Sequence, residues 1–117
     1  MNKKNLGKTG ECKIANYLTA NGWKILEKNF RYNRKEIDII ARKKSLIIFV
    51  EVKTRSNEKF GKGLEAVDVN KRNNIISVAR YYLRSKNLMN CNVRFDVASL
   101  DNNAFSYIKN AFQATGN

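Results

Sequence analysis

Two acidic residues lie where carboxylates are normally avoided. Asp38 stands between two isoleucines, and Glu51 directly follows the apolar run Leu46–Val50. Burying an unpaired carboxylate is costly, so a metal ion, a basic partner or a hydrogen-bond network must compensate each charge. The chain has only 10 acidic residues, which makes these two positions informative.

The segment Glu51-Val52-Lys53 adds geometry. Side chains alternate along a strand, so Glu51 and Lys53 project from one face. Asp38, on the preceding strand of a predicted hairpin, shares that face if the register allows. Mg²⁺ prefers hard oxygen ligands, and it polarises a phosphate and lowers the pKa of an attacking water. Two carboxylates beside a lysine therefore predict a phosphodiesterase site, in which Lys53 orients the water and Glu11 adds a carboxylate from the first helix.

Each of these residues also has an ordinary interpretation. Glu51 with Lys53 could be a solvated ion pair worth about 0–1 kcal/mol. Asp38 could be an edge-strand charge that blocks aggregation, and Glu11 a surface acid of a helix. These residues, the predicted order of elements and the basic charge together indicate a phosphodiesterase site more specifically than any one of them alone.

The charge of the chain favours an acidic partner. Among 117 residues, 23 Lys and Arg outnumber 10 Asp and Glu, for a net charge of +13. Nucleic acid is the commonest partner of so basic a domain. The absence of His excludes His-based triads, and two Cys cannot complete a structural zinc site. The longest strongly apolar run is too short to cross a bilayer, so we expect a cytoplasmic protein without a membrane partner.

The elements that must position these residues follow from hydrophobic periodicity and turn residues. Helices are predicted over Leu6–Ala20 and about Leu64–Ser85. Strands are predicted over Trp23–Tyr32, Glu36–Ala41, Leu46–Thr54 and Asn92–Ser99, with a short final strand at Phe105–Ile108. A meander followed by a helical crossover predicts an α/β domain over residues 1–117, with a mixed central sheet flanked by helices.

Two further expectations concern the second half of the chain. Alternation with Phe95 and Val97 predicts that Asp96 points outward and pairs with Arg94 or a neighbouring residue rather than with a metal. The basic loop Arg55–Gly63 could close on a substrate or simply be solvated. The tail is expected to dock Phe112 against the core.

These residues together resemble the small bacterial YraN-like proteins over nearly the whole chain. Two positions depart from the family pattern: Lys35 stands where Gly is usual, and Gly63 where Pro is common. The marks of the resemblance are Gly7-Lys8-Thr9-Gly10-Glu11, Ala15, Asn29–Arg31, Glu36–Ile40, Phe49–Arg55, Phe60-Gly61, Glu65–Val67, Lys71, Arg94–Val97 and Asn110–Phe112.

The resemblance implies a restriction-endonuclease-like core, α-β-β-β-α-β, of the PD-(D/E)xK superfamily, which includes relatives of Holliday-junction resolvases. In that superfamily the acid of the second strand and the E-x-K of the third form the metal site. These roles fall on Asp38, Glu51 and Lys53, with Glu11 as the helical acid. Relatives that cut four-way junctions are two-fold dimers, so a homodimer is one arrangement to test.

We therefore expect a Mg²⁺- or Mn²⁺-dependent nuclease acting on DNA, with structured or branched DNA as a candidate substrate. Asp38, Glu51 and Glu11 would hold the metal, together with the backbone carbonyl of Val52, and Lys53 would position the nucleophile. Two alternatives stay open: a non-catalytic nucleic-acid-binding protein with a vestigial metal site, and a module that docks an acidic protein. The predicted phosphate contacts are Arg55, Lys59, Lys62, Lys71 and Arg72.

Overall fold

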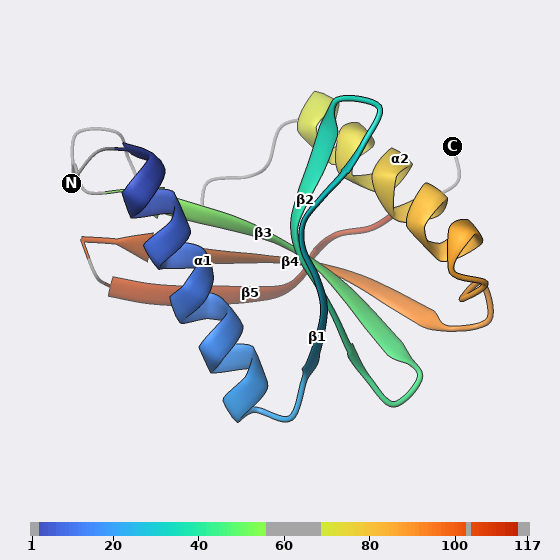
Figure 1. The fold of residues 1–117 in the computed structure, drawn as a ribbon, viewed down its shortest axis with the longest axis horizontal. Coiled ribbons are helices and arrows are strands. Elements are labelled where there is room, and N and C mark those ends of the chain that lie inside the picture. The colour runs from blue at the N-terminus through green and yellow to red at the C-terminus, as the bar shows by residue number, and fades with distance from the viewer. Residues whose placement is uncertain (1–2, 56–68, 103, 115–117) are drawn as a thin grey trace.

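The computed structural model describes residues 3–55, 69–102 and 104–114. Within these residues, two helices and five strands follow one another in the order α-β-β-β-α-β-β (Figure 1). Their bounds are α1 Lys3–Ala20, β1 Lys24–Tyr32, β2 Lys35–Lys43, β3 Leu46–Arg55, α2 Val69–Ser85, β4 Asn92–Asp101 and β5 Ala104–Phe112. The predicted loop Arg55–Gly63 and the first residues of the predicted second helix lie outside the described residues, except for the Arg55 backbone.

Apolar residues at helical spacing place both helices on the sheet. On α1 the buried residues are Ile14, Ala15 and Leu18, and on α2 they are Ile75, Val78, Ala79 and Tyr82. Helix α1 ends where Asn21-Gly22 predicts, since Gly22 takes a φ of 91° and the Trp23 N–H donates to the Leu18 carbonyl oxygen at 3.0 Å. Gly is favoured at this left-handed position because it has no Cβ.

The first three strands form the predicted antiparallel meander. Strand β1 pairs with β2 through a two-residue turn in which Asn33 and Arg34 both have positive φ values of 54° and 65°. Such turns match the right-handed twist of the strands. The second hairpin turns at Lys44-Ser45 and pairs Lys43 with Leu46.

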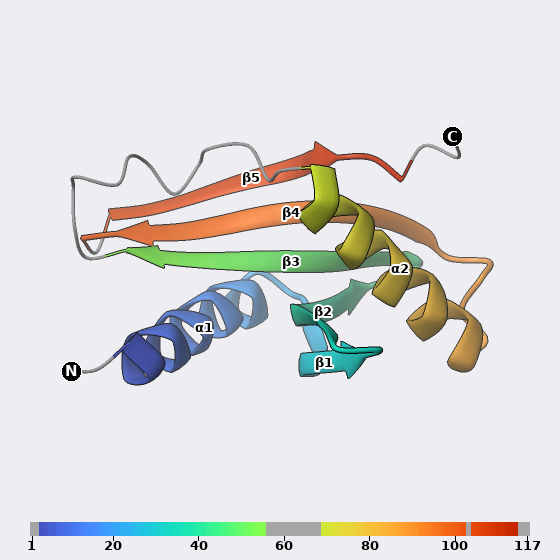
Figure 2. The same ribbon diagram turned by 90° about the horizontal axis from the view of Figure 1, so that it is seen from above.

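The mixed sheet that the sequence predicts is confirmed. The strand order is β1-β2-β3-β4-β5, and every neighbouring pair is antiparallel except β3 with β4, which α2 connects as a crossover. Figure 2 shows β3, β4 and β5 running side by side, whereas the β1–β2 hairpin turns steeply away from them. That turn opens the sheet between β2 and β3.

Two cores cover opposite faces of this sheet. Ile47 and Phe49 of β3 pack with α2, whereas Ile48 and Val50 pack with α1. Because successive residues of a strand point to opposite faces, the helices flank the sheet on both sides. Strand β3 is therefore buried on both faces, as its continuous apolar run predicts.

Strand β5 is longer than predicted and carries an irregularity. It extends to Phe112, which pairs with Phe95 and is buried, so the predicted docking of Phe112 is confirmed. The register shifts between Phe95 and Val97, and Asn110 has a φ of 55°. This bulge interrupts the alternating pattern, which is why the pattern alone predicts only the strand's first half.

Among the described helices, neither combines the length and the apolar composition that crossing a membrane requires.

Candidate metal and phosphodiester site

The site is centred on Asp38, where β2 leaves β3. The register of these two strands runs from Lys43 with Leu46 to Ile39 with Val50 and stops there. At this point the alternation of β2 also breaks, since Ile37 packs in the α2-side core but Ile39 packs in the α1-side core. Asp38 is thus the residue at which the strand changes face, and its carboxyl group lies in the opening between the strands.

The Asp38 carboxyl group is held by β3. Its Oδ2 accepts a hydrogen bond from the Val52 N–H at 2.8 Å, and its side chain also shares a hydrogen bond with Glu51. Burial first, and then the charge of Glu51, raise the pKa of Asp38 from 3.8 to about 8, although the Val52 N–H opposes the shift. The pair therefore holds a proton at neutral pH and behaves as one carboxyl-carboxylate unit.

Lys71 of α2 compensates the other carboxylate. Its Nζ lies 2.8 Å from Glu51 Oε2, and the Glu51 side chain is only 8% exposed. Glu51 follows Phe49 on the α2 side of β3, so alternation places it under this helix. The Lys71 ammonium thus already pairs with Glu51, one of the two acids that the sequence predicts for the site.

Glu11 approaches the same opening from the other helix. Its charge adds a smaller contribution to the raised pKa of Asp38. The preceding residue, Gly10, explains the approach: a Cβ there would collide with Thr54 Cγ2 of β3. Glycine therefore lets the first half of α1 lie directly on the end of β3.

The carboxyl pair opens into a pocket of about 380 Å³. The hairpin turn and β2 contribute Arg34, Lys35, Glu36 and Asp38, strand β3 contributes Glu51 and Val52, and α2 contributes Lys71, Asn74 and Ile75. Glu11 and the half-buried Lys53 are not among the described residues that line it. The structure thus brings Asp38, Glu51 and Val52 together at the pocket, whereas Glu11 and Lys53 do not line it.

Five lining residues are absent from the predicted site, and three of them come shortly before Asp38 in the chain. Arg34 lies in the β1–β2 turn, Lys35 is the first residue of β2, and Glu36 forms an ion pair with Arg31 at 2.7 Å. The sequence does indicate that Arg34 and Lys35 lie near the site, because they directly precede Glu36-Ile37-Asp38 in the chain. A turn between paired strands carries its side chains to the open end of the sheet.

The predicted phosphate contacts have different outcomes. Lys71 is 51% exposed and lines the pocket, although it is paired with Glu51, and Arg72 beside it is half-buried. Lys59, Lys62 and the side chain of Arg55 lie outside the described part of the structure. The contacts with phosphate remain predictions for all five.

Asp96 corrects one expectation. It pairs with Arg94 at 2.9 Å as predicted, but it is 0% exposed instead of pointing outward. Its carboxylate also accepts hydrogen bonds from the Tyr107 hydroxyl at 2.6 Å and the Asn110 N–H at 2.9 Å. The alternation pattern assumes one solvent-exposed face, whereas the face of β4 that carries Asp96 also carries Ala98, which packs in the α1-side core.

The donor set fits a hard divalent cation with few protein ligands. Within the described residues, no three acidic or cysteine side chains gather into a ready-made cluster. Mg²⁺, however, is commonly held by one or two carboxylates, with water and phosphate oxygens completing its shell. The paired oxygens of Asp38 and Glu51 match that demand, and in this structure they share a hydrogen bond while Glu51 also pairs with the Lys71 ammonium.

Comparison with known proteins gives the family. The model of the uncharacterised protein family UPF0102 matches residues 10–100. A UPF0102 protein of Clostridioides difficile is 51% identical over 96% of this chain and all of its own length. One from Caldanaerobacter subterraneus is 47% identical over 83% of this chain and 80% of its own. The resemblance to YraN-like proteins is thereby confirmed at the level of the family, and the chain belongs to UPF0102.

Proposed function

We propose that this protein is a Mg²⁺- or Mn²⁺-dependent endonuclease that hydrolyses phosphodiester bonds in DNA, including structured or branched DNA. The observation that supports it most is the Asp38–Glu51 carboxyl pair, which lies at a pocket lined by Arg34, Lys35 and Lys71. Two acids in an opening of the sheet can hold a cation, and the surrounding basic residues can hold the phosphates of the substrate.

The order of elements supports the same proposal. A helix, three antiparallel strands, a crossover helix and a parallel fourth strand agree with the restriction-endonuclease-like core that the resemblance implies. The metal site that the resemblance implies for such a core would fall on Asp38 and Glu51. Fold alone does not fix function, so the proposal depends on the side chains rather than on the topology.

Each residue of the site has a distinct role in the proposed reaction. Asp38 and Glu51 would hold the cation, with the Val52 carbonyl oxygen and Glu11 supplying further oxygen ligands. When bound, Mg²⁺ or Mn²⁺ would polarise the scissile phosphate and lower the pKa of the attacking water. Lys53 would orient that water and neutralise charge that develops on the phosphate.

The basic residues would hold the strand. Lys71 is exposed enough to move from Glu51 to a phosphate once a cation takes its place. Arg34 in the β1–β2 turn and Lys35 at the start of β2 would contact the DNA backbone from the hairpin side of the pocket. Such contacts carry no sequence information, so we expect binding that depends on salt and on DNA shape.

The test is cleavage of linear, flapped and four-way DNA with Mg²⁺ or Mn²⁺. We expect cleavage by the wild type and its loss in Glu51→Gln and Lys53→Ala. The matched controls are Glu27→Gln and Lys86→Ala, which remove the same charges outside the pocket and should leave cleavage unchanged. Activity that survives in Glu51→Gln and Lys53→Ala would overturn the assignment.

A second candidate is a nucleic-acid-binding protein with a vestigial metal site. It is favoured by the ion pair between Lys71 and Glu51, which satisfies the buried carboxylate without any metal. This candidate predicts DNA binding whose log K falls steeply with log salt, and no turnover with either metal. Running the cleavage panel beside a binding titration at two salt concentrations separates the two candidates.

A further inference from the structure

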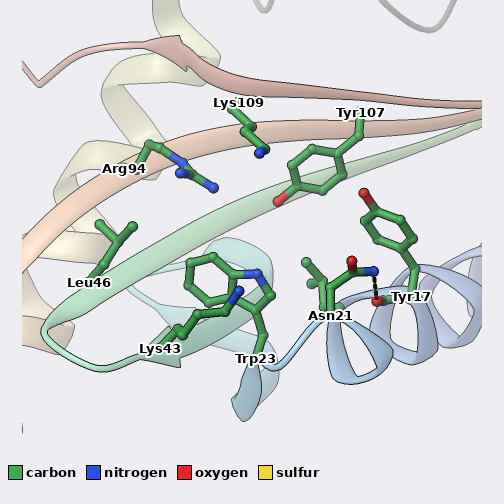
Figure 3. Close-up of a pocket in the computed structure, with 9 residues that line it drawn as sticks. Tyr17, Asn21, Trp23, Lys43, Leu46, Arg94, Tyr107 and Lys109 are labelled. Carbon is green, nitrogen blue, oxygen red and sulfur yellow. Dashed lines mark hydrogen bonds between the residues drawn. The ribbon is translucent and has the colours of Figure 1, made fainter.

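A second hollow, of about 310 Å³, lies on the α1 side of the sheet, opposite the carboxyl pair (Figure 3). Its walls come from the end of α1, the short link between α1 and β1, the β2–β3 hairpin, β4 and β5. The side chains that define it are the aromatic Tyr17, Trp23 and Tyr107 and the cationic Lys43, Arg94 and Lys109. No acidic side chain is among the described residues that line it.

Cations converge on an aromatic ring in this hollow. Lys43 Nζ lies 4.7 Å from the centroid of the Trp23 ring, and the Arg94 guanidinium lies 5.6 Å from it. Tyr17 and Tyr107 form a second aromatic wall, with their ring centroids 5.7 Å apart. Figure 3 shows the Lys109 amine reaching toward the space that these rings enclose. Flat apolar surfaces and positive charges thus share one small volume.

Buried Asp96 fixes two of these side chains in place. Arg94 Nε and Nη2 each donate to its carboxylate at 2.9 Å, and the Tyr107 hydroxyl donates at 2.6 Å. Asp96 neutralises Arg94, so Lys43 and Lys109 supply the net positive charge of the hollow. The guanidinium has five N–H donors, and Asp96 accepts two of them, which leaves others for a ligand.

We propose that this hollow binds a nucleotide unit, with the base stacked on Trp23 and the phosphate held by Lys43, Lys109 and Arg94. The flexible Lys43 side chain would leave the indole face as the base arrives and would move to the phosphate. Stacking of a base on an aromatic side chain is worth about 1–3 kcal/mol. Asn21 lines the same hollow and donates its Nδ2–H to a main-chain oxygen of α1, so its amide oxygen can accept from the base edge.

The nucleotide unit could be free in solution or part of a single strand, and both present the same base and phosphate. Trp23 reports directly on either, because it is the only tryptophan in the chain. We would titrate the full-length protein with dAMP, deoxyadenosine, inorganic phosphate and a short oligodeoxyadenylate while following tryptophan fluorescence. Saturable quenching by dAMP alone identifies a free nucleotide, and saturation by the oligonucleotide identifies a strand.

The chain offers a matched control for charge. Removing both lysines of the hollow with Lys43→Ala and Lys109→Ala should weaken binding by about tenfold or more, since each charge-assisted contact contributes at least a factor of several. The control pair, Lys28→Ala and Lys86→Ala, removes two exposed lysines elsewhere and should leave the affinity within about twofold.

Three results would overturn the proposal: no saturable quenching by dAMP or the oligonucleotide, equal quenching by inorganic phosphate, or equal weakening in the control pair. The proposal does not depend on nuclease activity, because its residues lie on the opposite face from Asp38 and Glu51. A failed fluorescence titration beside normal cleavage would refute only this site, and the reverse pattern would refute only the nuclease.

Discussion

The carboxyl pair makes protein stability depend on pH in a direction opposite to that of most acidic residues. The pKa of Asp38 is raised from 3.8 to about 8 by burial and by Glu51. Between these pH values the native state keeps a proton that the unfolded chain has released. The free energy of unfolding therefore falls as the pH rises through this window, and the contribution is fully present only below pH 4.

The size of this pH dependence follows from the single proton that the native state keeps. One proton changes the free energy of unfolding by at most about 1.4 kcal/mol per pH unit. Asp38→Asn keeps the shape of the side chain and an oxygen that can accept from the Val52 N–H, but it cannot ionise. Relative to this variant, the wild type should lose about 1.4 kcal/mol per unit near the middle of the window and level off above pH 8.

Urea denaturation followed by Trp23 fluorescence measures this difference directly. Subtracting the Asp38→Asn values removes the titration of the other groups. Glu36→Gln is the matched control, because it removes a carboxylate of the same strand whose partner Arg31 is 77% exposed. This control should keep the loss of stability with rising pH that Asp38→Asn removes. A flat difference between wild type and Asp38→Asn would refute the raised pKa and the shared proton.

Three further outcomes are expected. Gly10→Ala should lower the free energy of unfolding by about 1–3 kcal/mol in urea denaturation, because the added Cβ meets Thr54. The control Asn16→Ala, on the exposed side of α1, should not lower it, and equal stability of the two variants would contradict the close approach of α1 to β3. Tyr107→Phe should lower the free energy of unfolding by about 1–3 kcal/mol in thermal unfolding, since buried Asp96 loses a 2.6 Å hydrogen bond. An unchanged melting temperature would show that this hydrogen bond does not contribute to stability. Mn²⁺ affinity measured by calorimetry should rise up to about tenfold per pH unit and level off above pH 8, because the cation displaces the shared proton, and affinity independent of pH would contradict this.

Much of the fold could be predicted because its signals are local. The apolar spacing of α1 and α2, the glycine at the end of α1 and the apolar run Leu46–Val50 each fix an element through nearby residues. Alternation also put Glu51 on a definite face of β3. The sequence predicts that Asp38 lies near Glu51 only if the two strands pair in a suitable register. The structure brings the two residues together where β2 separates from β3.

What could not be predicted depends on long-range packing. The pairing of Lys71 with Glu51 requires the crossover helix to lie over β3, and no spacing in the sequence encodes that contact. Asp96 is buried beneath Tyr107 and beside the bulge at Asn110, and it accepts a hydrogen bond from each of them. Alternation predicts which residues share a face, but not how deeply that face is covered.

The most direct test of the metal site is a crystal structure of the protein grown with Mn²⁺ and measured at the manganese absorption edge. We predict one anomalous peak within bonding distance of both the Asp38 and Glu51 carboxylates, with the Lys71 amine displaced from Glu51. A peak elsewhere, or none while Lys71 keeps its ion pair at saturating Mn²⁺, would contradict the proposed site.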